Sequence, residues 1–217
     1  MQYRSLIIKC FQIVAFNFFG GVYAYATEID ANINTASLSG TTAEIAFDFI
    51  AGDGDLLNSA VISNFVTDGS FSPGTATLSG AAAGDLTTTA TLLNTAFFNE
   101  ILQPITLGSD IGFSVNLTQN LDPAATVPDS LSVFLLDGNG NNLFTTTDPT
   151  GADALLEFNI DGGALGNLNV YTATADINQP VTWSAAADVT SAVPEPAGIW
   201  LFAAGLFGLY CKRTAQR

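Results

Sequence analysis

The stretch Ile111-Gly112-Phe113-Ser114-Val115-Asn116-Leu117 alternates apolar residues with small or polar ones. A period of two places successive side chains on opposite faces of a β-strand, so one face of this strand is apolar. Residues 45–49, 131–135 and 156–160 repeat the pattern, and Gly, Pro, Asn or Asp turn signals flank each run. We therefore predict an all-β domain, and the spacing fits a jelly-roll-like β-sandwich with one face of each sheet buried.

The residues that usually cover exposed helix faces are scarce in the same region. No Lys or Arg lies between Lys9 and Lys212, and Glu is sparse, whereas Thr, Val, Phe and Asn are frequent. One segment, 94–103, has helix-like apolar spacing that Pro104 would end, and we prefer a strand or an edge turn there. Residues 184–196 are predicted to be a linker.

The charge is strongly one-sided. The chain has 217 residues, with 20 acidic and 5 basic side chains and a net charge of -15. All acidic residues except Glu195 lie between Glu28 and Asp188, and every basic residue lies near a chain end. Without cations to displace counterions the central region should not bind nucleic acid, and it should repel anionic membranes. Solubility of an exported protein is the simplest role for this charge.

Most catalytic chemistry is excluded by composition. The chain has no His, and its two cysteines, Cys10 and Cys211, lie in the apolar terminal segments. The central region therefore has no disulfide, Ser-His pair, Schiff-base lysine or Cys/His metal site. A carboxylate pair could hydrolyse a glycoside, but no signature singles out one pair, and we do not expect an enzyme.

The first 26 residues have the features of a secretory signal peptide. Arg4 and Lys9 give a positive start, and residues 10–22 are mostly apolar. Ala24 and Ala26 are the small residues that signal peptidase reads, with cleavage expected after Ala26. A retained transmembrane helix is the alternative, but the apolar stretch is shorter than the roughly 20 residues that a span needs.

The C-terminus has three parts in a fixed order. Pro194-Glu195-Pro196 comes first, an uncharged apolar run over 197–211 follows, and Lys212 with Arg213 begins a basic end. Two prolines so close together favour an extended, accessible segment. The apolar run is predicted to be a single short membrane helix, and the positive-inside rule places Lys212 and Arg213 in the cytoplasm as a membrane stop. The central domain would then face outward.

This tail resembles the PEP-CTERM sorting signal, and the resemblance covers about 25 residues. It implies processing by exosortase, a membrane-embedded enzyme that removes the tail near Pro194-Glu195-Pro196, in a Gram-negative host that makes exopolysaccharide. The central region resembles one group of PEP-CTERM proteins of unassigned activity, through residues 60–65, 96–100 and 147–156. The resemblance to that group implies no catalytic residue in this chain.

Calcium is the metal that the composition allows. Asp137, Asn139 and Asn141 place oxygen-bearing side chains at every second residue, and Asp148 falls at the twelfth position of a loop of the EF-hand kind. The sixth position is Asn142 where that loop has Gly, and the flanks are predicted strands. A hairpin turn over the Gly- and Asn-rich segment is the favoured alternative. Residues 51–55 form a second acidic turn with the same two interpretations.

Sugar binding is a further hypothesis. β-Sandwiches bind sugars through exposed aromatic side chains with Asn and Asp nearby, and Trp183 and Tyr171 are candidates. A Trp in an alternating run is more often part of the core.

These observations define four segments: a signal peptide (1–26), a β-sandwich domain (27–183), a linker with the Pro-Glu-Pro motif (184–196) and a membrane-sorting end (197–217). We predict an exported, non-enzymatic protein of the cell surface or extracellular matrix. Its precursor would lie in the inner membrane with the domain outward, and its partners would be signal peptidase, exosortase and extracellular polysaccharide. The alternatives are a calcium-dependent module that binds exopolysaccharide and a carboxylate-based glycosidase.

Overall fold

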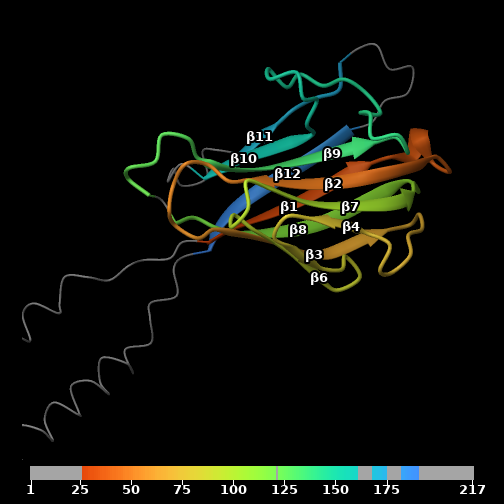
Figure 1. Ribbon diagram of the computed structural model, residues 1–217. Coiled ribbons are helices and arrows are strands. Elements are labelled where there is room, and N and C mark those ends of the chain that lie inside the picture. Colours follow the sequence, from red (N-terminus) through yellow and green to blue (C-terminus); the bar gives the residue numbers. More distant parts are fainter. Residues whose placement is uncertain (1–25, 121, 161–167, 175–181, 191–217) are drawn as a thin grey trace, which may run out of the picture. The chain divides into compact units, whose positions relative to one another are not determined.

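The computed structural model describes residues 26–120, 122–160, 168–174 and 182–190, and its regular elements are strands apart from one 3-10 turn, η1 (Ala36–Leu38) (Figure 1). The strands form two six-stranded sheets, and all of their pairings are antiparallel. The predicted all-β class is confirmed. Within the described residues, no helix has the length and hydropathy that crossing a membrane requires.

Sheet A has the strand order β12-β1-β8-β3-β6-β5. Its strands, in that order, are β12 (Thr182–Thr190), β1 (Ala26–Asn34), β8 (Asp110–Thr118), β3 (Ser59–Thr67), β6 (Thr89–Leu93) and β5 (Ala82–Gly84). A register shift in β3 between Ser63 and Val66 marks a β-bulge, where Asn64 has a φ of 53°.

Sheet B has the strand order β11-β10-β9-β2-β7-β4. Its strands, in that order, are β11 (Leu168–Val170), β10 (Leu156–Ile160), β9 (Asp129–Leu136), β2 (Thr42–Ile50), β7 (Phe98–Thr106) and β4 (Thr77–Ser79).

The inward faces of the two sheets share one hydrophobic core. Ile45, Phe47 and Phe49 of sheet B and Phe113 and Val115 of sheet A belong to the same buried cluster. The Phe47 and Phe113 rings meet edge to face with their centroids 5.0 Å apart, an arrangement that aromatic pairs favour. Each fully buried side chain of this size contributes about 1.5–3 kcal/mol relative to an exposed one. Because the chain has no disulfide in this region, the core carries most of the stability.

The four alternating runs in the sequence all lie in central strands, namely β2, β8, β9 and β10. The segment with helix-like spacing consists of a turn followed by β7, so the preferred interpretation of a strand or turn is confirmed. Pro104 lies inside β7, opposite Glu44 of β2. On its other side β4 pairs only with residues 100–102, so Pro104 occupies an edge position where its missing N–H costs little.

The end of the domain differs from the predicted boundary at residue 183. β12 continues to Thr190 and pairs with β1 along its whole length, so residues 184–190, which we had assigned to the linker, are part of sheet A. The alternation of apolar residues fades in this segment, and for that reason the sequence pattern ends too early. The predicted signal peptide up to Tyr25, the Pro-Glu-Pro motif and the apolar tail lie outside the described residues.

Both ends of the domain lie at the same end of sheet A. Ala26, the first residue of β1, pairs with Thr190 of β12 and with Thr118 of β8. The loops 51–58, 94–97 and 119–128 follow or precede strands at that same end (Figure 1). We call these three loops, with Ala26 and Thr190, the chain-exit end.

Candidate functional site

The predicted calcium ligands Asp137, Asn139 and Asn141 lie in a tight turn at the end of β9. The Oδ1 atom of Asp137 accepts hydrogen bonds from the backbone N–H groups of Asn139 at 2.8 Å and Asn141 at 2.9 Å. The N–H of Asp137 donates to the carbonyl of Asn141 at 2.7 Å, which closes the turn. The bonds from Asn141 and then Asn139 lower the pKa of Asp137 below its ordinary value. The favoured alternative, a turn of the hairpin kind, describes this segment.

Asp148 is buried farther along the same connection between β9 and β10. Its Oδ1 accepts hydrogen bonds from the backbone N–H and the hydroxyl of Thr150, both at 2.8 Å, and its Oδ2 accepts one from the N–H of Ala154 at 3.1 Å. Burial acts to raise the pKa of Asp148, but these hydrogen bonds outweigh it and hold the pKa below the ordinary value. In the described part of the chain, no three His, Cys, Asp or Glu side chains gather as a metal site. Calcium binding by Asp137 and Asp148 stays a prediction.

The second acidic turn joins two loops of the chain-exit end. Asp53 accepts hydrogen bonds from the N–H groups of Thr126 and Val127, both at 2.8 Å, and from the hydroxyl of Thr126 at 2.6 Å. The Thr126 hydroxyl and then these N–H groups lower the pKa of Asp53. The carboxylate of Asp122 accepts the N–H of Asp55 at 3.0 Å in return. These carboxylates hold loops 51–58 and 119–128 together.

Asp129 connects the two sheets beneath those loops. Its side chain is buried, and it accepts hydrogen bonds from the N–H of Gly52 at 2.7 Å and from the side-chain amides of Asn58 and Asn94, both at 2.8 Å. Gly52 and Asp129 adjoin strands of sheet B, whereas Asn58 and Asn94 adjoin strands of sheet A. A buried carboxylate with three donors is well compensated for its lost hydration.

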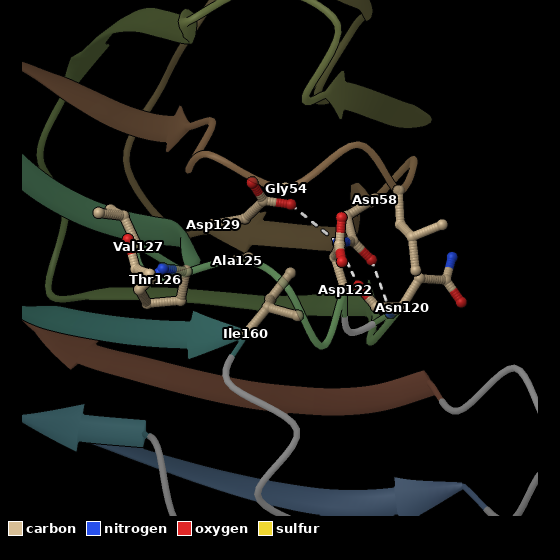
Figure 2. A pocket seen from close by; sticks show the side chains of 11 residues that line it. Gly54, Asn58, Asn120, Asp122, Ala125, Thr126, Val127, Asp129 and Ile160 are labelled. Carbon is tan, nitrogen blue, oxygen red and sulfur yellow. Dashed lines mark hydrogen bonds between the residues drawn. The ribbon is translucent and has the colours of Figure 1, made fainter.

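A cavity of about 130 Å³ lies between these loops. Figure 2 shows the side chains that line it, which come from loops 51–58 and 119–128, from the start of β9 and from the end of β10. Asn58, Asn120, Asp122 and Asp129 give it polar walls, and Ile160 adds an apolar one. This volume suits several water molecules better than a drug-sized ligand, which needs about 300 Å³ or more.

Large apolar side chains are exposed at the same end. They are Leu56 and Leu57 in loop 51–58, Phe97 in loop 94–97 and Val127 in loop 119–128. Exposed large apolar side chains that gather on neighbouring loops are unusual and mark contact surfaces more often than isolated ones do.

A row of polar side chains crosses the outer face of sheet B. The strand registers place the following six residues side by side, from β4 to β11: Ser79, Glu100, Asp48, Ser132, Glu157 and Asn169. Directly paired residues share a face, and neighbouring strands lie about 4.8 Å apart. Asp48 and Glu100 are therefore adjacent carboxylates.

The pair has unusual electrostatics. Partial burial, and then repulsion by Glu100, raises the pKa of Asp48 to about 7. Burial likewise raises the pKa of Glu100, which the hydrogen bond from Ser79 opposes. Among the described residues, the Oδ1 atom of Asp48 has no hydrogen-bond partner. The pair can therefore hold a proton near neutral pH.

The two aromatic candidates for sugar binding have other partners. Trp183 packs against the core, stacks on Phe144 with ring centroids 5.4 Å apart and donates its indole N–H to the carbonyl of Leu155 at 2.8 Å. The Tyr171 hydroxyl donates to Glu157 at 2.6 Å, at one end of the polar row. Burial and this bond raise the pKa of Tyr171 above its usual range. Trp183 is therefore partly buried against the core, with one ring face covered by Phe144.

The processing residues Ala24, Pro194, Glu195 and Pro196, and the membrane stop Lys212 and Arg213, lie outside the described residues. Only Ala26 is described, as the first residue of β1. Comparison of the chain with protein-family models, curated proteins and solved structures gives no match.

Sequence reasoning missed the Asp48–Glu100 pair and the apolar tips of the chain-exit end. The pair depends on the register between β2 and β7, which residues 52 positions apart do not reveal. A usable signal was the charge of Asp48 between Phe47 and Phe49, in the middle of a strand. Leu56 and Leu57, beside the acidic turn at 51–55, were the corresponding signal for the loops.

Proposed function

We propose that the chain is an exported, non-enzymatic protein of the cell surface or extracellular matrix, with a jelly-roll-like β-sandwich as its mature domain. The order of three sequence features in the tail carries this proposal: Pro194-Glu195-Pro196 comes first, the apolar run 197–211 follows, and Lys212 with Arg213 comes last. An N-terminal signal peptide that ends at Ala26 completes the export route. Signal peptidase and exosortase would be its processing partners, and extracellular polysaccharide its surroundings.

The arrangement of strands supports processing at both ends. β1 begins at Ala26 and β12 ends at Thr190, and the two residues are paired. Cleavage after Ala26 would remove only the first residue of β1, and cleavage near Pro194 would fall beyond the end of β12. The core would keep every strand, so the mature domain would remain folded after both cuts.

A tail variant tests the proposal. Replacement of Pro194, Glu195 and Pro196 by Ala, in the host that carries the chain, should leave the protein uncleaved in the inner-membrane fraction. The control variant Pro73→Ala changes an exposed proline within the domain, and the protein that carries it should be processed normally. Release of the triple variant into the medium at the control rate would refute sorting through this motif.

Glycoside hydrolysis is a second candidate because of one observation, the adjacent carboxylates Asp48 and Glu100. A glycosidase needs one carboxyl group protonated near neutral pH and a second one about 5–5.5 Å away in retaining enzymes. The pKa of Asp48, raised to about 7, suits the first role. Release of reducing sugar from a polysaccharide panel, lost in Asp48→Asn and Glu100→Gln, would establish it. No release by the unaltered protein would remove it.

A further inference from the structure

The exposed apolar side chains at the chain-exit end are held in place. Phe97 is 76 % exposed, Leu57 56 %, Val127 55 % and Leu56 44 %. The backbone carbonyls of all four accept hydrogen bonds from neighbouring loops: Phe97 from Ala51 at 2.9 Å, Leu56 from the Asn94 side chain at 2.8 Å, Leu57 from the Asn120 side chain at 2.7 Å, and Val127 from Asp53 at 3.1 Å. The loops that carry these exposed side chains are therefore held together by hydrogen bonds.

The chain leaves the domain at this same end. β12 ends at Thr190, and the apolar run begins at residue 197, so only residues 191–196 lie between them. A fully extended chain gains at most about 3.6 Å per residue, so this connection spans no more than about 25 Å in any conformation. With the apolar run in a bilayer, Thr190 cannot lie farther from the start of that run than this distance.

We infer that the apolar tips of the chain-exit end, Leu56, Leu57, Phe97 and Val127, dock on the lipid surface while the tail is in the membrane. This inference rests on the membrane-inserted tail of the proposed function. We assign a lipid surface as the occupant, because the six-residue connection keeps this end of the domain within reach of the bilayer. A tether of this length gives a high effective concentration, so a few shallow apolar contacts suffice.

The negative charge of the loops determines which lipid headgroups they can approach. Asp53, Asp55 and Asp122 lie in two of the three loops that carry the apolar tips, and no Lys or Arg lies between Lys9 and Lys212. Anionic headgroups would repel these carboxylates, and an electrically neutral, zwitterionic surface would not. Docking should therefore weaken as the fraction of anionic lipid rises.

Depth-dependent fluorescence quenching tests the inference on the full chain. In a background with Cys10→Ser and Cys211→Ser, a single fluorescent label is placed at Leu57→Cys, Val127→Cys, Asn139→Cys or Gly205→Cys. Asn139 follows β9 at the opposite end of the domain, and Gly205 lies in the apolar run. The chain is reconstituted into phosphatidylcholine vesicles that carry brominated acyl chains.

We expect quenching at positions 57, 127 and 205 and none at 139. Quenching at 205 but not at 57 or 127 would overturn the inference and leave the membrane tail standing. No quenching at 205 would overturn the membrane step of the proposed function, and the inference with it. Equal quenching at 139 would show non-specific adsorption and would also overturn the inference.

A second pair of variants separates the apolar contact from the tether. Leu56→Ser with Leu57→Ser should lower the quenching at position 127 several-fold without changing it at 205. Val66→Ser is the matched control, because Val66 is 59 % exposed on the outer face of sheet A. Equal quenching at 127 in both variants would refute a role for the apolar tips.

Discussion

Asp48 is the residue whose ionisation opposes folding most clearly. It lies in β2 between the buried rings of Phe47 and Phe49, and its register places it against Glu100. Burial, with the charge of Glu100, raises its pKa from 3.8 to about 7. Since the folded state holds this proton more tightly than the unfolded state, the contribution of Asp48 to stability is present below about pH 4 and is lost as the pH rises to about 7.

The opposite sign holds for Asp53, Asp137 and Asp148, whose pKa values are lowered by hydrogen bonds. Their contribution is present above the ordinary carboxyl pKa and is lost as the pH falls through the lowered values. The free energy of unfolding should therefore be greatest near pH 4, and it should decline from there as the pH rises to about 7.

Asp48→Asn tests this account at the scale of one residue. The variant should be more stable than the unaltered protein at pH 8, by up to about 4 kcal/mol, and should lose the decline between pH 4 and pH 7. Chemical unfolding across that pH range measures both effects. Asp30→Asn, on the outer face of sheet A, is the control and should keep the decline. If the free energy of unfolding of Asp48→Asn still fell between pH 4 and pH 7 as in the unaltered protein, other carboxylates would be its cause.

At the scale of elements, the packing of loop 51–58 against loop 119–128 depends on a glycine. A Cβ atom at Gly52 would lie 2.1 Å from the carbonyl oxygen of Val127, which is backbone and cannot move alone. The N–H of Gly52 also donates to Asp129. A side chain here must push the two loops apart.

Gly52→Ala should therefore lower the free energy of unfolding by about 1–3 kcal/mol, the usual cost of overpacking. Gly138→Ala is a matched control, because a Cβ atom at Gly138 meets nothing within 4 Å. Thermal unfolding of both variants compares them directly. Equal stability of the two would mean that the loops are not packed in this way.

The acidic turns are the second prediction at this scale. If Asp137 and Asp148 bind calcium, the ion at about 100 times its dissociation constant would stabilise the domain by about 2.7 kcal/mol and raise the unfolding midpoint by several degrees. The midpoint of the full chain is measured in mild detergent with calcium and with sodium at equal ionic strength. A rise with calcium alone that Asp137→Ala abolishes would establish the site. No rise would leave both turns as hydrogen-bonded loops.

The strands could be predicted from sequence where one face of the sheet is buried. The runs in β2, β8, β9 and β10 show the period of two because their alternate residues enter the core. β12 was cut short, and β1, β3 and β6 were not singled out as separate runs. β4, β5 and β11 were not identified because three-residue edge strands carry almost no period. The pairing of Asp48 with Glu100 and the gathering of Leu57, Phe97 and Val127 follow from register and topology, which a local pattern does not contain.

At the scale of the whole molecule, stability and the proposed sorting depend on different parts of the chain. The core shared by the two sheets lies within residues 25–191, which form one compact unit. The proposed export and sorting signals lie in the segments on either side. Removal of both segments should leave a folded domain with 19 carboxylates and no side-chain cation.

The intact mass of the protein recovered from the medium and cell surface of its host tests the central claim most directly. Our account predicts a mature form that begins at Thr27 and lacks residues 197–217. A mass that retains either terminal segment would contradict processing at that end, and a mass that retains both would contradict the proposed function.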